Sequence, residues 1–371
     1  MAYPQNMHSR SGRPGELALL EQIRARAAQS ARGGPFAPGG LRLGIGDDCA
    51  LLRIGPGEEL AVTTDLAIDG RHFRLAWHSP ESIGHRTLAR GLSDLAAMGA
   101  RPVAAFLSLG LPGALVSDFP GISSKTGKKN QKKTWVERFM DGFFALAHEF
   151  QTPLAGGDLA ESPLAVADIV LTGVVRRGKA LLRSGARPGD LLYVTGTLGG
   201  AAASLARLAQ WAETQSRTRA ANSGPAQSTS PRIPARLQPP LAPHLFPQPR
   251  VAQGLWLARR GLASAAIDLS DGLSTDLAHL CEESHVAAEV DAAALPIHPG
   301  ASLAQALHGG EDYELLFAAL PSIRVPRRIA DVPVTRIGQF VRTRKGRPKV
   351  VLVTVQGRQP LVPKGWEHFS H

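Results

Sequence analysis

Residues 263–277 read Ala-Ser-Ala-Ala-Ile-Asp-Leu-Ser-Asp-Gly-Leu-Ser-Thr-Asp-Leu, and this stretch joins a strand to a helix. The apolar run from Ala263 to Asp268 predicts a buried strand. Leu273 and Leu277 predict the buried face of a helix that opens at Asp271. Helix capping accounts for Ser270 or Asp271, but not for both acids and the glycine that follows them. This junction therefore predicts a site as well as a fold that mixes strands and helices.

The same arrangement, acids beside glycines or at the end of an apolar run, recurs elsewhere in the chain. The other stretches are Gly44-Ile-Gly-Asp-Asp48, Thr63-Thr-Asp65, Leu92-Ser-Asp94, Gly156-Gly-Asp158 and Gly309-Gly-Glu-Asp-Tyr-Glu314. Each stretch alone is explained as well by an ordinary turn. Two carboxylates about 4 Å apart repel by about 4 kcal/mol at an effective dielectric constant of about 20, so converging acids need a cation. Mg²⁺ takes oxygen ligands and bridges to substrate phosphates. Together the stretches predict a site with several Mg²⁺ ions for a polyphosphate.

Length and composition favour a two-domain enzyme. The chain has 371 residues, 43% of them hydrophobic, and its strands and helices predict an α+β or α/β fold with a boundary near residue 180. Two cysteines are too few for a disulfide framework and favour a reducing, cytoplasmic setting. Prolines, glycines and an arginine interrupt the most apolar segment, residues 95–116, so we expect no membrane span and no secretory signal. Residues 1–14 are expected to form a disordered tail.

The net charge of +11 is unevenly distributed. Residues 117–133 and 212–250 each carry a net charge of +4, and both look like inserted loops. The second contains eight prolines and is expected to be mobile. A third basic run, Arg342 to Lys349, is interpreted as a hairpin loop. Because the charge lies in solvated loops, we expect no nucleic-acid partner.

The sequence lacks the motifs of several common enzyme classes. It contains no Gly-x-x-x-x-Gly-Lys-Ser/Thr loop, protein-kinase motif set, His-Glu-x-x-His pattern or Gly-x-Ser-x-Gly elbow. The glycine turn at 196–200 fits either a phosphate cradle at a helix N-terminus or a plain tight turn. His78, His85 and His148 are expected at the surface.

Local patterns predict most of the elements. Ser79-Pro80-Glu81 predicts the start of a helix that runs to about Met98 and stops at Gly99. Another helix is predicted over 134–150, and a third from the glycine turn to about Trp211. Strands are predicted at 60–64, 102–111, 168–176, 191–195, 263–268, 313–319, 334–340 and 349–355.

Taken together, the motifs resemble the thiamine-monophosphate kinase family, in the superfamily of aminoimidazole ribonucleotide synthetase and selenophosphate synthetase. The resemblance covers about residues 15–371 outside the two basic insertions. It rests on GIGDDCALL (44–52), TTDLAIDGRHF (63–73), LSDLAAMGARP (92–102), GGD (156–158), RSGARPGDLLYVTG (183–196), AIDLSDGLSTDL (266–277), GGEDYELLF (309–317) and KGWEHF (364–369).

The resemblance implies an N-terminal α/β domain (15–180) that dimerises through its sheet, a C-terminal α/β domain (181–371), and an active site between them. It implies ATP-dependent phosphorylation of thiamine monophosphate to thiamine diphosphate by a homodimer, with ATP as co-substrate. By position, it assigns several Mg²⁺ ions to Asp48, Thr63, Thr64, Asp65, Asp94, Asp158, Asp268 and Asp271. It assigns ATP to Gly157, Asp158, Arg183 and Ser270, and thiamine phosphate to His72, Glu311 and Trp366.

The chain departs from the family pattern at two places. Leu159-Ala160-Glu161 follows GGD where hydroxyl residues are common, and Gly91 stands where an Asn is common. The departures put local hydrogen bonds in doubt and leave the acids unchanged. The alternatives are another ATP-dependent enzyme of the superfamily and an inactive protein that binds nucleotide or metal. The phosphate nucleophile is already anionic at pH 7, so we expect no general base.

Overall fold

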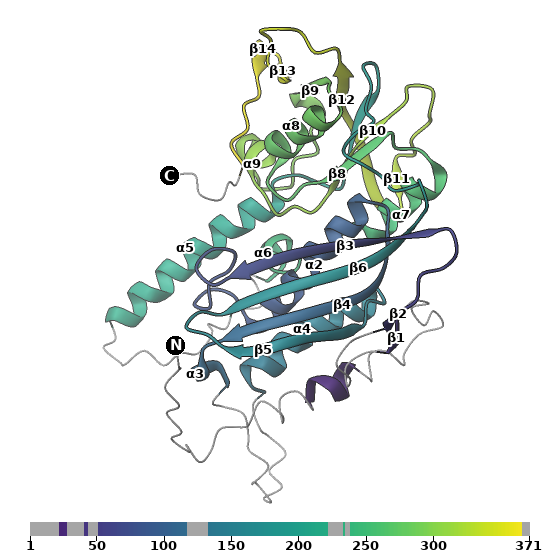
Figure 1. Cartoon of the computed structure of the whole chain (residues 1–371). Coiled ribbons are helices and arrows are strands. Elements are labelled where there is room, and N and C mark those ends of the chain that lie inside the picture. The colour runs from purple at the N-terminus through teal and green to yellow at the C-terminus, as the bar shows by residue number, and fades with distance from the viewer. Residues whose placement is uncertain are drawn as a thin grey trace, which may run out of the picture.

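The computed structural model describes residues 22–27, 41–43, 51–116, 133–221, 233 and 238–365, which form two large sheets with helices packed against them and a separate two-stranded sheet of β1 and β2 (Figure 1). The first part of the chain contains β1 (Leu41–Leu43), β2 (Leu51–Leu52), β3 (Glu58–Ile68), α2 (Pro80–Ala97), β4 (Arg101–Leu111), α3 (Gly113–Val116), α4 (Trp135–Glu149), β5 (Leu154–Glu161) and β6 (Val166–Arg176). The second part begins with β7 (Leu191–Thr195), α5 (Gly200–Ala221), α6 (Gln238–Leu245), α7 (Val251–Arg260), β8 (Ala265–Asp268) and α8 (Leu273–Glu283). It ends with β9 (Ala287–Asp291), the 3₁₀ turn η2 (Ala292–Ala294), α9 (Leu303–His308), β10 (Leu315–Ala319), β11 (Arg328–Ile329), β12 (Val332–Val341), β13 (Val350–Thr354) and β14 (Gly357–Pro360).

The N-terminal sheet has four strands in the order β3-β6-β4-β5. All its neighbours are antiparallel except β4 and β5. Helices α2 and α4 cover one face of the sheet, as Figure 1 shows. We call the other side the open face. There Leu60, Val62 and Leu66 of β3 are 41–58% exposed.

Helix α2 begins as its sequence predicts. The Ser79 hydroxyl accepts the backbone N–H of Ser82, and Pro80 occupies the first turn. The helix packs against α4 with glycines at the contact. A Cβ on Gly84 would lie 2.0 Å from the carbonyl oxygen of Phe139, and one on Gly142 would lie 1.9 Å from that of Glu81.

The C-terminal sheet has eight strands in the order β14-β13-β9-β12-β7-β10-β8, with β11 paired to β12. Its pairs are antiparallel except β13 with β9. Leucines of α8 pack with buried residues of β8, β9 and β13 in a second core. Helix α2 contacts both α7 and β8, so it links the two halves of the molecule.

The structure confirms the two-part mixed fold, and several predicted elements match closely. The prediction of an inserted loop over residues 212–250 is wrong for the described part of that segment. Helix α5 continues to Ala221, and α6 buries Leu241 and Leu245 beside Leu208. His78 and His85 are 1% and 6% exposed, so their expected surface position is also wrong, whereas His148 is exposed. The tail 1–14 and nearly all of the insertion 117–133 lie outside the described residues. No helix in the described ranges is long and apolar enough to cross a membrane.

Candidate active site

The site lies where α2 connects the two sheets. Ser93 and Asp94, adjacent residues of α2, face different partners. The Thr63 hydroxyl on β3 donates a hydrogen bond to Asp94 Oδ2. The Ser93 hydroxyl donates to Asp268 Oδ2, at the end of β8, over 2.7 Å. One turn of helix therefore joins the acid-bearing strands of the N-terminal and C-terminal sheets.

Asp94 and Asp268 are crowded by like charge. Burial, then the nearby Asp268 and Asp65, raise the pKa of Asp94 to about 7. Burial also raises the pKa of Asp268, and Asp271 adds to the rise. The Ser93 hydroxyl and the Arg183 guanidinium oppose the increase at Asp268 without cancelling it. The acids thus have less counter-charge than two ionised carboxylates need, which is the situation a bound cation would relieve.

The loop that carries Ser270 and Asp271 is held by a third acid. Asp276 Oδ2 accepts the backbone N–H groups of Asp271 at 3.1 Å and Gly272 at 2.9 Å. Gly272 has φ 110°, and a Cβ there would approach the backbone of His308 and Gly309 to 2.9 Å. Burial, followed by the charges of Asp268 and Asp271, raises the pKa of Asp276 well above its ordinary value. Asp276 was not among the predicted site residues, although it lies only five residues after Asp271 in the sequence.

Asp65 already has a cationic partner in this structure. Arg90 of α2 donates from Nε to Asp65 Oδ2 over 2.7 Å and from Nη2 to Oδ1 over 2.5 Å. Both side chains are largely buried, which strengthens the pair. The sequence prediction missed Arg90, because a lone arginine on a helix is ordinarily a surface residue.

Glu311 is held by a network that the sequence analysis also missed. Arg86 Nη2 donates to Glu311 Oε1 over 2.5 Å, and His244 Nδ1 lies 3.1 Å from Oε2. Burial opposes ionisation of Glu311, but Arg86 and His244 hold its pKa well below its ordinary value. Glu311 has φ 67°, a left-handed conformation that is uncommon outside glycine and is often found at functional sites.

Two buried histidines extend this network. His78 Nδ1 lies 3.1 Å from the backbone nitrogen of Arg74 and 3.2 Å from its carbonyl oxygen. His78 Nε2 lies 2.9 Å from His244 Nε2, and His244 Nδ1 lies 3.1 Å from Glu311 Oε2 and 3.0 Å from Arg86 Nη1. Burial lowers the pKa of both imidazoles and so favours their neutral forms.

His72 joins the same region through its backbone. Its carbonyl oxygen accepts Arg86 Nη2 at 3.1 Å, and its Nδ1 accepts the N–H of Ile68 at 3.1 Å. The structure therefore brings His72 and Glu311 together around one guanidinium.

The remaining acids of Gly309–Glu314 are structural. Asp312 accepts the backbone N–H groups of Gly199 at 2.6 Å and Ala201 at 3.0 Å, at the N-terminus of α5. This carboxylate occupies the amides that a phosphate would need, so the glycine turn at 196–200 is a tight turn. Glu314 is buried and pairs with Arg250 through two contacts of 2.6 Å.

Asp158 lies apart from the other acids. It is inside β5, level with Ser108 of β4, Asp168 of β6 and Leu66 of β3. Side chains in one such row share a face, and exposed Leu66 marks it as the open face. Asp65 belongs to the next row, which faces the helices. Because β3 and β5 are opposite edges, Asp65 and Asp158 lie about 14 Å apart across the sheet.

The other predicted residues divide in the same way. Thr63 faces Asp94, whereas exposed Thr64 faces the opposite side of β3. Gly157 lies beside Asp158 with φ 150°, and a Cβ there would lie 1.8 Å from the carbonyl oxygen of Leu107. Arg183 is exposed and close enough to lower the pKa of Asp94 and Asp268.

Asp48 and Trp366 lie outside the described residues. Gly365 precedes Trp366 and donates its N–H to Thr275 Oγ1 over 3.1 Å, so the last described residue lies at the loop of Asp271.

The donor set fits Mg²⁺ when substrate phosphates are counted among the ligands. Within the described ranges, no three His, Cys, Asp or Glu residues are arranged to hold a metal ion alone. Mg²⁺ commonly takes one or two carboxylates and completes its shell with water and phosphate oxygens. Asp94 and Asp268, oxygen donors with too little counter-charge, suit that role.

Comparison with known proteins gives a consistent picture over nearly the whole chain. Residues 46–175 match the AIR synthase related protein, N-terminal domain, and residues 187–350 match the AIR synthase related protein, C-terminal domain. A thiamine-monophosphate kinase of Escherichia coli (strain K12) is 38% identical over 344 residues, which cover 89% of this chain and 93% of that protein.

Two solved structures share the fold. The crystal structure of thiamine-monophosphate kinase from Stenotrophomonas maltophilia K279a is 37% identical, with a TM-score of 0.69 over 91% of this chain and 96% of that one. The structure of AaThiL complexed with AMPPCP and TMP is 25% identical, with a TM-score of 0.66 over 96% of this chain and 97% of that one.

Proposed function

The chain belongs to the thiamine-monophosphate kinases of the AIR synthase related family, and from this premise we propose how its residues carry out the reaction. The enzyme transfers a phosphoryl group from ATP to thiamine monophosphate and forms thiamine diphosphate, as the names of its relatives and the complex of one relative with AMPPCP and TMP support. We expect it to act in the cytoplasm, where ATP is available.

The observation that carries the mechanism is the contact between Ser93–Asp94 and Asp268. These residues come from the two halves of the molecule, and their carboxylates lack sufficient counter-charge. We propose that Asp94, Asp268 and Asp271, with Asp65 and Asp48, hold Mg²⁺. Bound there, Mg²⁺ would neutralise the phosphates of both substrates and stabilise charge in the transition state.

The side chains around the acids orient the two substrates. Arg183 is close enough to lower the pKa of Asp94 and Asp268, and Ser270 lies between Asp268 and Asp271 in the chain, so both suit the phosphates of ATP. His72 and Glu311 share Arg86 and suit thiamine monophosphate, whose thiazolium ring is cationic. The phosphate oxygen that attacks the γ-phosphorus is already ionised at pH 7, so no side chain must remove a proton. We propose direct in-line transfer, in which these residues act by positioning and charge.

The position of Asp158 leads us to propose that the active unit is a homodimer. Asp158 shares the open face of the N-terminal sheet with the exposed apolar side chains of Leu60, Val62 and Leu66. Such a stripe favours packing against another sheet. In a homodimer formed through this face, Gly157 and Asp158 of one subunit would complete the site of the other. This arrangement gives Asp158 a role although it lies about 14 Å from Asp65 within its own chain.

Substitution of the two buried acids tests the mechanism. Asp94→Asn and Asp268→Asn should each abolish ADP formation with ATP, Mg²⁺ and thiamine monophosphate, and should leave the circular dichroism spectrum unchanged. Asp190→Asn is the matched control, because Asp190 is buried and bonded to Ser264 but lies outside the acid cluster. Full turnover in Asp268→Asn, or equal loss in Asp190→Asn, would contradict the metal-holding role.

A further inference from the structure

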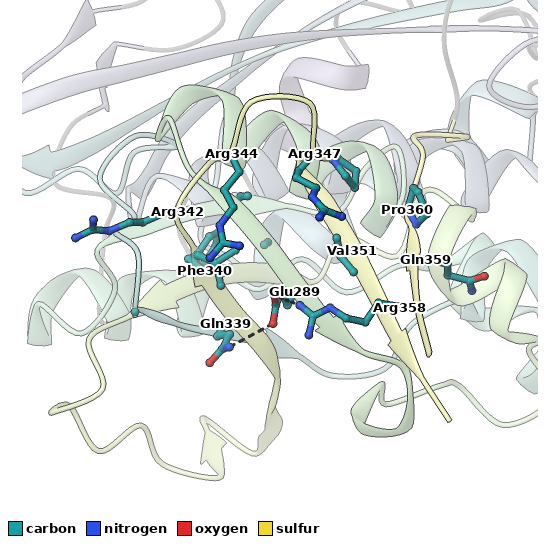
Figure 2. Close-up of a pocket in the computed structure, with 15 residues that line it drawn as sticks. Glu289, Gln339, Phe340, Arg342, Arg344, Arg347, Val351, Arg358, Gln359 and Pro360 are labelled. Atoms are coloured by element: carbon teal, nitrogen blue, oxygen red, sulfur yellow. Dashed lines mark hydrogen bonds and ion pairs between the residues drawn. The ribbon is translucent and has the colours of Figure 1, made fainter. Parts of the chain in front are cut away.

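The basic loop, residues 342–349, overhangs a cavity on the C-terminal domain that the kinase site does not use. The cavity has a volume of about 840 Å³. Figure 2 shows Arg344 and Arg347 pointing into it from the loop, on the side of Val351. Arg342 extends outward at its rim. Along the floor, Arg358 pairs with Glu289.

The cavity is separate from the acid cluster. Its lining strands β9, β12, β13 and β14 lie toward one edge of the eight-stranded sheet, whereas Asp268 ends β8 at the other edge. Three strand spacings separate β8 from β12, the nearest lining strand, or about 14 Å. Glu289 and Val351 form a row on the sheet, and their neighbours Ala288, Val290 and Leu352 point the other way, into the core under α8. The cavity therefore opens on the side of the sheet opposite α8.

The basic loop is fixed at several points. The backbone N–H of Arg347 donates to the carbonyl oxygen of Arg344 over 3.0 Å and closes a turn in which Gly346 has φ 74°. The Thr343 hydroxyl donates to the His285 carbonyl over 3.0 Å, and Lys349 pairs with Glu282 at 3.0 Å. These contacts hold the backbone that carries Arg344 and Arg347, so less conformational entropy is lost when a ligand binds.

The charges in the cavity are unbalanced. Glu289 is the acidic residue of the lining and pairs with Arg358. Across the described ranges, the guanidinium groups of Arg342, Arg344 and Arg347 have no ion-pair partner. Guanidinium groups bind phosphate oxygens in pairs of parallel hydrogen bonds, so Arg344 and Arg347 match two adjacent phosphates. The apolar side chains of Val351 and Pro360 leave room beside them for a ring, whereas the side chain of Phe340 is buried in the core under α8.

We propose that this cavity is a second binding site, distinct from the kinase site, for an organic diphosphate: Arg344 and Arg347 take the diphosphate and the apolar floor takes the attached ring. A cavity of about 840 Å³ is larger than an inorganic ion needs and is in the range that holds a nucleotide-sized molecule. The source of the diphosphate, a nucleotide or a thiamine ester, is decided by titration.

Isothermal titration calorimetry on the full chain in EDTA tests the site, because chelation removes the divalent ions that phosphates would need at the acid cluster. The probes are ADP, thiamine diphosphate and inorganic pyrophosphate. We expect one binding event per chain, tighter for ADP or thiamine diphosphate than for pyrophosphate. Arg344→Gln with Arg347→Gln should weaken it roughly 10- to 100-fold. The kinase turnover of this double variant should match that of the unchanged chain.

Arg324→Gln with Arg327→Gln is the matched control, because it removes two exposed arginines that do not line the cavity. Equal weakening in the control would contradict the proposal, since it would show attraction to overall charge. If pyrophosphate bound as tightly as ADP and thiamine diphosphate, the apolar floor would contribute nothing to affinity, which would contradict its proposed contact with the ring. Binding of a single-stranded oligonucleotide through Arg344 and Arg347, without binding of any of the three probes, would replace the proposal with a nucleic-acid surface.

Discussion

His244 offers a sharp test of how Glu311 is positioned. His244→Phe keeps a ring in the buried space beside Arg86 and removes Nδ1, which lies 3.1 Å from Glu311 Oε2 and 3.0 Å from Arg86 Nη1. A hydrogen bond to a charged group is worth about 1.5–3 kcal/mol, and partial exposure of Glu311 places this one near the lower end. If the loss falls on substrate binding, about 1.4 kcal/mol corresponds to a tenfold change in affinity.

We therefore expect KM for thiamine monophosphate to rise about tenfold in His244→Phe. KM for ATP should change little, because His244 contacts the side of the site assigned to thiamine. Steady-state kinetics with each substrate varied in turn measures both values. His85→Phe is the matched control, because His85 is a buried histidine that contacts the Pro247 carbonyl instead of Glu311. An unchanged KM for thiamine monophosphate in His244→Phe, or the same rise in His85→Phe, would refute the reasoning.

Three further predictions follow from burial and packing. Burial lowers the pKa of His78 and His244, so the unfolded chain binds more protons below the ordinary pKa of 6.5. The urea midpoint of unfolding should therefore fall as the pH is lowered from 7.5 to 5.5, and it should fall less in the double variant His78→Asn/His244→Asn. An equal fall in the unchanged chain and the double variant would contradict the assignment of this pH dependence to the two histidines. Gly142→Ala should lower the free energy of unfolding by about 1–3 kcal/mol, because its Cβ would lie 1.9 Å from the Glu81 carbonyl oxygen; an unchanged urea midpoint would show that α2 and α4 can separate freely. Asp158→Asn and Asp268→Asn, each inactive alone, should regain activity when mixed, because one shared site of the mixed dimer is intact; no recovery after verified subunit exchange would argue against a shared site.

Local sequence patterns were sufficient to predict the helices and strands whose start or end is determined by residues within one turn of each other. Ser79-Pro80-Glu81 predicts the start of α2 because capping is a short-range interaction. The acids Asp94 and Asp268 could be singled out because each ends an apolar run. Their closeness depends on α2 packing between the two sheets, which no local pattern contains.

The residues that were missed depend on long-range contacts. His244 lies in a proline-rich segment that suggests a mobile loop, yet it contacts Glu311, 67 positions further along the chain. Arg86 and Arg90 lie on a helix where arginines ordinarily face water, and their burial follows from the position of the second half of the molecule. Asp158 looked like a turn residue, because the parallel pairing of β5 with β4 leaves no hairpin signal.

The central claim is that the converging acids serve phosphoryl transfer from ATP to thiamine monophosphate. Its most direct test is to incubate the purified chain with Mg²⁺ and ATP and to quantify ADP and thiamine diphosphate by chromatography, with thiamine monophosphate or free thiamine as acceptor. The account predicts equal amounts of ADP and thiamine diphosphate from thiamine monophosphate, no phosphorylated product from free thiamine, and no turnover in EDTA. Phosphorylation of free thiamine but not of its monophosphate, or full activity in EDTA, would contradict it.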